Sequence, residues 1–285
     1  MTDSIFEAYN KCKKELAAAG IEDCVFEAKQ IIKHITGLTN AQILSSYTKK
    51  LTQFQQNNLT AIIKQRKVRY PLQYIIGKWS FYGREFTVGT GVLIPRADTE
   101  TLIDEALLIS KDMKSPKILD LCTGSGCIGI TLAKEISDSN VTLLEKYPEA
   151  SRYAYKNIID NGAENVMLYE GDVLKGDKNE GEYDLIVSNP PYINGEDMKN
   201  LQPEVQFEPE TALDGGEDGL VFYRAIIENY TKSIKKGGAF VFEVGIGQAD
   251  DVAELLEAKG FKNIGKAKDL GGIDRVVFGT LEQVQ

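Results

Sequence analysis

The chain has 285 residues, of which 42% are hydrophobic, and this is enough for one large packed domain or two modest ones. It shows no charged-then-apolar leader and no apolar run near the ~18 residues of a membrane span, so we expect a soluble, cytoplasmic protein without a membrane partner. Its four cysteines are too few and too irregularly spaced for a disulfide framework, and His34, the only histidine, lies far from other potential ligands. We therefore expect reduced thiols and no metal site.

Charge is distributed unevenly between the two ends of the chain. Residues 1–80 carry twelve Lys and Arg against six Asp and Glu, a net charge of +6, and the whole chain carries −9, which leaves −15 for residues 81–285. This asymmetry indicates a mildly basic recognition part followed by an acidic catalytic part. Because an acidic domain repels a phosphate backbone, we expect no direct binding of nucleic acid.

The first part of the chain, from residue 3 to about residue 69, has the apolar periodicity of helices. Capping-box spacings at Ser4…Glu7, Thr39…Gln42 and Thr52…Gln55 mark three helix starts. The pattern predicts a small helical bundle. Its last helix ends in a basic run, residues 64–69, which is interpreted as either a solvated face or a surface for docking a partner.

A short aromatic-rich stretch, residues 79–88, follows the helices and is typical of two strands about a glycine-containing turn. We therefore divide the chain into a helical domain (1–79), a β-hairpin linker (80–90) and a second domain (91–285). In the second domain, strand patterns at 117–122, 141–145, 166–170, 184–188 and 239–244 alternate with helical patterns. This alternation predicts an α/β fold with a mainly parallel, doubly wound sheet. Two further strands, 262–267 and 275–279, are separated only by a turn and should pair antiparallel.

A glycine-rich turn joins the first strand of this sheet to the helix after it, in the order Cys122, Thr123, Gly124, Ser125, Gly126. Glycines allow close approach of a ligand, and the start of a helix favours an anionic group. Glu145 ends the next strand, 21 residues beyond Gly124, where a carboxylate can accept hydrogen bonds from a ribose diol. These features predict an adenosine-containing cofactor, and they fit NAD and S-adenosylmethionine equally.

The third strand is followed by Asp172 and Val173, which offer an acceptor for an adenine amino group and an apolar contact for its ring. The fourth strand is followed by Asn189, Pro190, Pro191 and Tyr192. Neither proline has an N–H, so backbone carbonyls remain free to accept, and Asn189 adds a side-chain oxygen. These acceptors suit a planar NH2 group, either a carboxamide or the amino group of adenine or cytosine, with the Tyr192 ring against its face.

With these motifs assembled, the chain resembles the HemK/PrmC family of release factor glutamine methyltransferases over nearly its full length. The matching stretches are residues 70–77, 81–83, 93–100, the glycine loop, 189–192, 207–213 and 274–276. The tetrapeptide 189–192 alone is shared with adenine and cytosine amino-methyltransferases. Its combination with residues 95–100 and 207–213 is far more specific.

The resemblance implies a seven-stranded class I (Rossmann-like) S-adenosylmethionine-dependent methyltransferase domain over 91–285, preceded by a helical domain that docks class I peptide chain release factors. The reaction implied is methylation of the side-chain amide nitrogen of the glutamine in the release factor's Gly-Gly-Gln motif. We also expect the protein to be a monomer. Residues 122–126, Glu145, Asp172, Val173 and Asn189 would bind the cofactor. The catalytic tetrapeptide 189–192 would hold the glutamine.

Two positions depart from the family pattern. Cys122 stands where glycine is usual, in a loop similar to that of the sister branch that methylates a ribosomal-protein glutamine, and Glu145 replaces the more usual Asp. The sister activity, a nucleic-acid amino-methyltransferase, an NAD-dependent oxidoreductase and a non-catalytic adaptor remain as alternatives. The roles of Arg96 and Glu208 are left open by the sequence.

Overall fold

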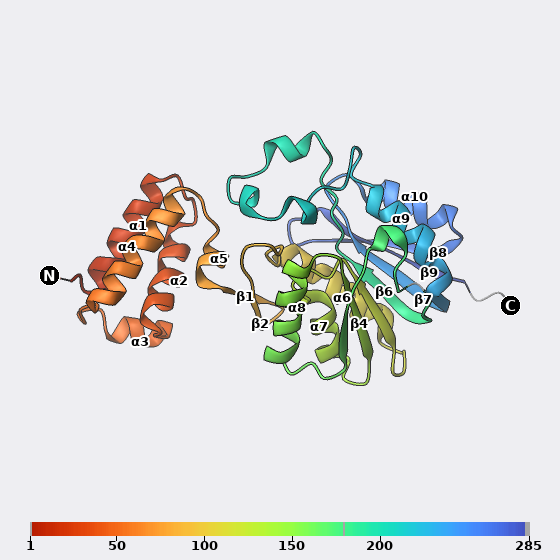
Figure 1. The fold of residues 1–285 in the computed structure, drawn as a ribbon, viewed down its shortest axis with the longest axis horizontal. Helices are drawn as coiled ribbons and strands as arrows, with labels where there is room; N and C mark the ends of the chain where they lie inside the picture. The colour runs from red at the N-terminus through yellow and green to blue at the C-terminus, as the bar shows by residue number, and fades with distance from the viewer. Residues whose placement is uncertain (1, 179, 283–285) are drawn as a thin grey trace. The chain divides into compact units, whose positions relative to one another are not determined.

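The structure is a computed structural model that describes residues 2–178 and 180–282 (Figure 1). Its contacts divide the chain into two compact units. The first, the helical unit, contains the residues up to Gly77 together with Gln202–Phe207, and the second, the sheet unit, contains Lys78–Leu201 and the residues from Glu208 onward. The sequence pattern places residues 202–207 in the sheet domain, whereas their contacts group them with the helices.

The helical unit is the bundle that the sequence predicts. Its helices are α1 (Ile5–Ala18), α2 (Cys24–Thr36), α3 (Asn40–Ser45), α4 (Gln53–Lys67) and α5 (Leu72–Ile76). All three predicted capping boxes are present, at the starts of α1, α3 and α4. The apolar stripes of α1, α2 and α4 meet in one core that includes Leu16, Ile32 and Leu59.

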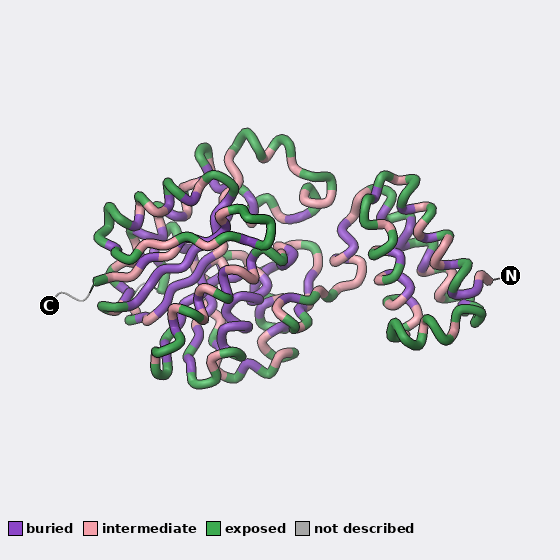
Figure 2. The backbone as a smooth tube through the Cα atoms, turned by 180° about the vertical axis from the view of Figure 1, so that it is seen from behind, coloured by how far each residue is buried: buried purple, intermediate pink, exposed green. Residues whose placement is uncertain are grey.

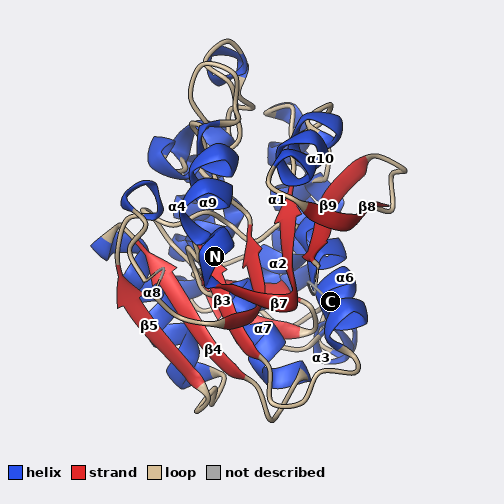
Figure 3. Cartoon of the chain, turned by 90° about the vertical axis from the view of Figure 1, so that its right-hand side faces the viewer, coloured by secondary structure: helices blue, strands red, loops and turns tan. Residues whose placement is uncertain are grey.

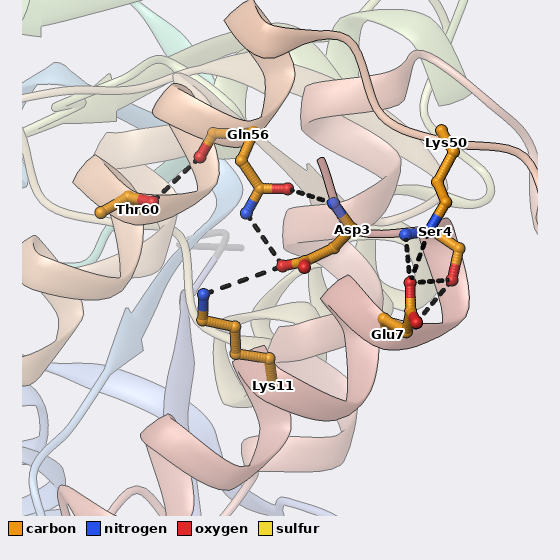
Figure 4. A network of polar contacts seen from close by, with 7 residues as sticks. All are labelled: Asp3, Ser4, Glu7, Lys11, Lys50, Gln56 and Thr60. Atoms are coloured by element: carbon orange, nitrogen blue, oxygen red, sulfur yellow. Dashed lines mark hydrogen bonds and ion pairs between the residues drawn. The ribbon is translucent and has the colours of Figure 1, made fainter. Parts of the chain in front are cut away.

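Polar contacts join the start of α1 to α4 and to Lys50, which precedes α4 in the sequence (Figure 4). The backbone N–H of Asp3 donates to Gln56 Oε1 at 3.0 Å, and Gln56 Nε2 donates to Asp3 Oδ2 at 3.0 Å. Glu7, the acid of the first capping box, also accepts from Lys50 Nζ at 3.1 Å. These reciprocal bonds fix the register between the first and last long helices of the bundle.

One member of the basic run at the end of α4 is not solvated, which corrects the solvated-face interpretation for that residue. Arg66 is 1% exposed, and its guanidinium donates to both carboxylate oxygens of Glu27, at 2.7 and 2.8 Å. It also donates to Glu204 Oε1 at 3.1 Å and to the carbonyl of Tyr70 at 2.6 Å. The Tyr70 ring meets that of Phe207 edge to face, so Glu204 and Phe207 both anchor the 202–207 segment within the helical unit.

The sheet unit opens with the predicted hairpin, β1 (Lys78–Phe81) paired antiparallel with β2 (Arg84–Thr87). A seven-stranded sheet follows, with the order β5-β4-β3-β6-β7-β9-β8. Its strands are β3 (Lys117–Leu121), β4 (Asn140–Glu145), β5 (Val166–Glu170), β6 (Tyr183–Ser188), β7 (Ile234–Glu243), β8 (Phe261–Lys268) and β9 (Asp274–Leu281). β3 to β7 are parallel and β9 is antiparallel to both its neighbours, so the predicted fold class and the antiparallel final pair are confirmed.

Helices cover both faces of this sheet (Figure 3). They are α6 (Glu100–Ser110), α7 (Cys127–Glu135), α8 (Pro148–Asp160), α9 (Val221–Tyr230) and α10 (Ala249–Ala258). Successive strand residues alternate between two cores, because side chains of a strand point to opposite faces. Leu185 packs with α6 and α7, and Ile186, the next residue, packs with α9 and α10. The central strands are consequently buried on both sides, as Figure 2 shows.

Strand order places a ligand site at the middle of the sheet. β3 pairs with β4 on one side and with β6 on the other, so the chain connections diverge in opposite directions from β3 and β6. In open α/β sheets ligands bind outside the carboxyl ends of strands at such a switch point. In the part of the chain that the structure describes, no helix is long and apolar enough to cross a membrane.

Candidate active site

A cavity lies at the carboxyl ends of β3, β4, β5 and β6 and gathers most of the residues predicted from the sequence. Nine of the predicted residues line it: Cys122, Thr123, Gly124, Ser125, Glu145, Asp172, Val173, Asn189 and Pro191. Gly126, Pro190 and Tyr192 are not part of its lining. Four loops that are far apart in the sequence thus meet in one cavity of the sheet unit.

The glycine loop is held from beneath by a buried carboxyl group. Asp120, in β3, accepts hydrogen bonds from the Thr123 hydroxyl and from the backbone N–H of Gly129. Burial raises the pKa of Asp120 to about 7. Gly126 has φ +80°, and a Cβ added there would lie 2.8 Å from Ile130 Cδ1. Gly126 therefore shapes the entry into α7 without lining the cavity.

Cys122, at the first loop position, has a backbone conformation that glycine adopts most easily. Its φ is +59°, in the left-handed region of backbone conformation that residues other than Gly, Asn and Asp rarely adopt. Such a conformation costs roughly 1–2 kcal/mol. Burial raises the pKa of the Cys122 thiol well above its usual value, so this cysteine lines the cavity as a small uncharged side chain.

Glu145 presents a carboxylate to the cavity from the end of β4. Its Oε2 accepts from the Gly124 N–H at 2.8 Å, and its Oε1 accepts from the N–H groups of Lys146 and Tyr147, both at 2.9 Å. Burial raises its pKa, and these three backbone donors lower it. A carboxylate has about four lone-pair sites, so acceptor capacity remains for a ribose diol.

Asp172 and Val173 line the cavity beyond the end of β5. Asp172 caps the short helical turn Val173–Lys175 by accepting from the Leu174 N–H at 3.0 Å, and Lys146 Nζ lies 3.0 Å from its Oδ2. Asp172 is therefore the N-cap of this helical turn. Contact of Asp172 with an adenine amino group stays a prediction, as does contact of Val173 with the ring.

Asn189 follows β6 directly and is half-buried at the cavity wall. Its Nδ2 donates to Thr99 Oγ1 at 3.4 Å, which leaves Oδ1 as the acceptor for a ligand. Pro190 and Pro191 are buried, and Pro191 lines the cavity.

Tyr192, the last residue of the tetrapeptide, contacts neighbouring protein groups and does not line the cavity. Its hydroxyl donates to Glu243 Oε1 at 3.4 Å, and its carbonyl accepts from Gln248 Nε2 at 2.9 Å. Gly215 approaches it so closely that an added Cβ would lie 2.7 Å from the Tyr192 Cα. The expected ring contact with a substrate remains a prediction.

A second wall of the cavity comes from two loops that the sequence left without a role. Glu208, whose side chain is almost fully buried, accepts from the Ile94 N–H at 2.9 Å and pairs with the guanidinium of Arg96. The residues beside these partners line the cavity: Val92, Leu93, Pro95, Pro209, Thr211 and Ala212. Arg96 and Glu208 thus join residues 92–96 to residues 208–212 and fix the shape of the wall.

Comparison with known proteins gives two family models that match this chain. The PrmC N-terminal domain matches residues 7–77, and the methyltransferase small domain matches residues 97–236. Among solved structures, the hMettl16 catalytic domain in complex with an RNA hairpin has a TM-score of 0.58 at 13% identity, covering 87% of this chain and 95% of that one. At that identity the likeness shows the methyltransferase fold alone.

Two curated relatives, both named release factor glutamine methyltransferase, match most of the chain. The protein from Geobacter sulfurreducens is 39% identical over 269 residues, covering 93% of each chain. The protein from Fusobacterium nucleatum is 36% identical over 274 residues, covering 95% of this chain and 77% of the relative. The chain therefore belongs to the family of release factor glutamine methyltransferases.

Proposed function

We propose that this S-adenosylmethionine-dependent methyltransferase methylates the side-chain amide nitrogen of the glutamine in the Gly-Gly-Gln motif of class I peptide chain release factors. One observation carries the proposal. Glu145 and Val173, which suit an adenosine-containing cofactor, line the same cavity as Asn189 and Pro191, which belong to the amide-binding tetrapeptide. A methyl donor and an amide could therefore meet in one enclosed space.

The cavity residues fit S-adenosylmethionine by the chemistry of their side chains. Glu145 has lone pairs for the ribose diol, Asp172 is an acceptor for the adenine amino group, and Val173 is an apolar contact for its ring. When bound, the cofactor supplies a methyl group on a positively charged sulfur. The acidic residues 81–285, with a net charge of −15, favour retention of a cation.

Asn189 and Pro190 would hold the substrate amide. An amide nitrogen is a poor nucleophile because its lone pair is delocalised into the carbonyl. Acceptance of its two N–H bonds by Asn189 Oδ1 and the Pro190 carbonyl would localise electron density on nitrogen and orient it. Orientation of this kind can lower a barrier by up to ~7–11 kcal/mol. No residue of 189–192 is a strong base, so the proton leaves to water during or after methyl transfer.

The helical unit is proposed to recognise the release factor. Residues 1–80 carry a net charge of +6, and the exposed basic residues Lys64 and Lys67 lie at the end of α4. We propose that the enzyme acts as a cytoplasmic monomer and binds no nucleic acid directly. Catalysis and recognition would then belong to different units of the chain.

Mass spectrometry tests the proposed function. A purified release factor is incubated with the enzyme and S-adenosylmethionine, and fragmentation locates any added methyl group. We expect one methyl group on the Gly-Gly-Gln glutamine, and none on a release factor in which that glutamine is replaced by alanine. A methyl group at another residue, or none at all with the cofactor bound, would contradict the proposal.

A further inference from the structure

Arg96 is a cation in the wall of the cavity, and most of its hydrogen-bond donors are unused. Its side chain is 36% exposed, and one guanidinium nitrogen, Nη2, pairs with Glu208. A guanidinium has five N–H donors in a planar fork. Nε and Nη1 have no hydrogen-bond partner among residues 2–178 and 180–282, and neither is one of the buried polar atoms that lack a partner there. These donors are therefore exposed and free to bind a ligand.

Glu208 fixes the position of this guanidinium. Its side chain is 1% exposed, and its two carboxylate oxygens accept from Arg96 and from the Ile94 N–H, the latter at 2.9 Å. The carboxylate also offsets the charge of the arginine, which would otherwise repel a cationic cofactor. Joining the two loops of this wall requires only Nη2, so that structural task leaves the other donors of Arg96 without a role.

Two of the described residues that line the cavity are cations, and their contacts place them beside different groups. Lys146 pairs with Asp172 at 3.0 Å, next to the residues that suit adenosine. The carbonyl of Arg96 accepts from the Thr99 N–H at 3.3 Å, and Thr99 Oγ1 accepts from Asn189 Nδ2 at 3.4 Å. Arg96 is therefore the cation on the amide-binding side of the cavity.

S-adenosylmethionine has one charged group that the residues assigned so far leave without a partner. Glu145, Asp172 and Val173 suit its ribose and adenine, whereas its methionyl part carries an α-carboxylate. The sulfur joins this part to the methyl group, so a methyl group that reaches an amide at Asn189 brings the methionyl part to the same side of the cavity. A guanidinium suits a carboxylate, because it can bind both oxygens through two parallel N–H bonds.

The glycine loop is the other candidate for an anionic group, because a helix begins there. Three of its backbone donors are already in use. The N–H groups of Thr123, Gly124 and Gly126 donate to the Leu144 carbonyl, to Glu145 Oε2 and to the Thr123 carbonyl, at 3.1, 2.8 and 2.9 Å. Arg96, in contrast, offers several free donors on one rigid group.

We propose that Arg96 binds the α-carboxylate of S-adenosylmethionine through the N–H groups that Glu208 leaves free. The inference rests on the proposed function, because it takes Asn189 as the residue that holds the acceptor amide. It concerns binding of the cofactor alone, so its test needs no release factor. In this assignment Glu145 and Arg96 hold the two ends of the cofactor.

Calorimetric titration with two ligands tests the inference. One is S-adenosylmethionine, and the other is decarboxylated S-adenosylmethionine, in which a hydrogen atom replaces the α-carboxylate. Arg96→Met removes the guanidinium and keeps an unbranched side chain. Lys146→Met is the matched control, because it removes the other cation that lines the cavity. Binding of the decarboxylated ligand also reports whether each variant retains a folded site.

We expect the unsubstituted enzyme to bind S-adenosylmethionine at least about tenfold more tightly than the decarboxylated ligand, the scale of hydrogen bonds to a charged group. In Arg96→Met the Kd for S-adenosylmethionine should rise about tenfold or more. The Kd for the decarboxylated ligand should stay the same or fall, because this ligand carries only positive charge. Lys146→Met should change both Kd values by a similar factor, so that the preference for the carboxylate depends on Arg96.

An unchanged Kd for S-adenosylmethionine in Arg96→Met would overturn the inference. An equal rise for both ligands would also overturn it, because Arg96 would then act only by joining the two loops. The same loss of preference in Lys146→Met would overturn it as well, since the effect would be one of overall charge. Absence of methyl transfer to a release factor, with the expected binding results, would instead contradict the proposed function.

Discussion

Asn189 and Glu145 line the same cavity, but their environments suit different tasks. Asn189 keeps a neutral acceptor free at the wall, whereas Glu145 is a carboxylate fixed by three backbone N–H groups. We therefore expect Asn189→Ala to lower kcat at least a hundredfold with a much smaller effect on the Kd for S-adenosylmethionine. Single-turnover kinetics together with calorimetric titration of the cofactor measures both quantities, and equal kcat in the variant and the unsubstituted enzyme would contradict the assignment.

Glu145→Ala should have the reverse effect. Loss of the carboxylate removes the acceptor for a ribose diol and leaves the Gly124 N–H without its partner. We expect the Kd for S-adenosylmethionine to rise about tenfold or more, with kcat at saturating cofactor changed less. Unaltered cofactor affinity would show that Glu145 has no part in binding. Glu149→Ala is the control, because Glu149 is an exposed acid in the first turn of α8 and does not line the cavity.

Glu243 should also leave a signature in the pH dependence of stability. Its pKa is about 7 in the folded protein against 4.5 for the unperturbed group, so the folded state holds a proton that the unfolded state has released. The stability this supplies is fully present below pH 4.5 and is lost as the pH rises to 7, by up to about 3 kcal/mol. Glu243→Gln does not titrate. Its free energy of unfolding relative to the unsubstituted protein should therefore increase from pH 5 to pH 8, and a pH-independent difference in urea denaturation would contradict this.

At the scale of elements, the loop after η5 (Glu210–Ala212) holds the tetrapeptide by close backbone approach. A Cβ at Gly215 would lie 2.7 Å from the Tyr192 Cα, whereas a Cβ at Gly195 would meet nothing within 4 Å. We expect Gly215→Ala to displace residues 189–192 and lower kcat more than tenfold, because misplacement of a binding group by about 1 Å can cost a hundredfold. Gly195→Ala is the control and should leave kcat unchanged. Equal activity of the two variants would contradict the prediction.

The 202–207 segment gives a second test at this scale. Glu204 pairs with Arg66 and with Arg69, and Arg66 has two further partners, Glu27 on α2 and the Tyr70 carbonyl. Glu204→Gln should speed amide hydrogen exchange in 202–207 while exchange in α2 and α4 stays as in the unsubstituted protein, because the Arg66–Glu27 pair is retained. Unchanged exchange in 202–207 would show that the ion pairs of Glu204 with Arg66 and Arg69 do not hold this segment.

At the scale of the whole molecule, alternation and turn chemistry predict most of the fold. The central strands of the sheet unit are largely apolar runs between turns. The observed strand bounds differ from the predicted ones mainly in β7, which begins at Ile234. Strand order could not be derived from periodicity, since no local signal states which strands pair. Residues 202–207 contact the helical unit through the ion pairs of Glu204 with Arg66 and Arg69 and through the Phe207 ring against Tyr70. A basic run does not reveal which of its members is buried and takes part in such pairs.

Some residues of the candidate site could also be predicted from the sequence, and others could not. Residues at strand ends, such as Glu145 and Asn189, were predictable because parallel strands bring their carboxyl ends to one edge. Thr99 and Glu243 were not singled out, although a lone carboxylate ending the apolar run 239–244 was a signal available in the sequence. Thr99 contacts Asn189 and Glu243 contacts Tyr192, and spacing along the sequence does not encode contacts between such separate elements.

The central claim is that the enzyme methylates a glutamine amide of a release factor, bound in this cavity, in preference to other acceptors. One reaction tests it most directly, in which labelled S-adenosylmethionine is offered to the enzyme with a release factor, ribosomal proteins and RNA together. The account predicts label in the release factor, on the Gly-Gly-Gln glutamine alone, and its loss with Asn189→Ala. Label in a ribosomal protein or in RNA, with the release factor unmodified, would contradict it.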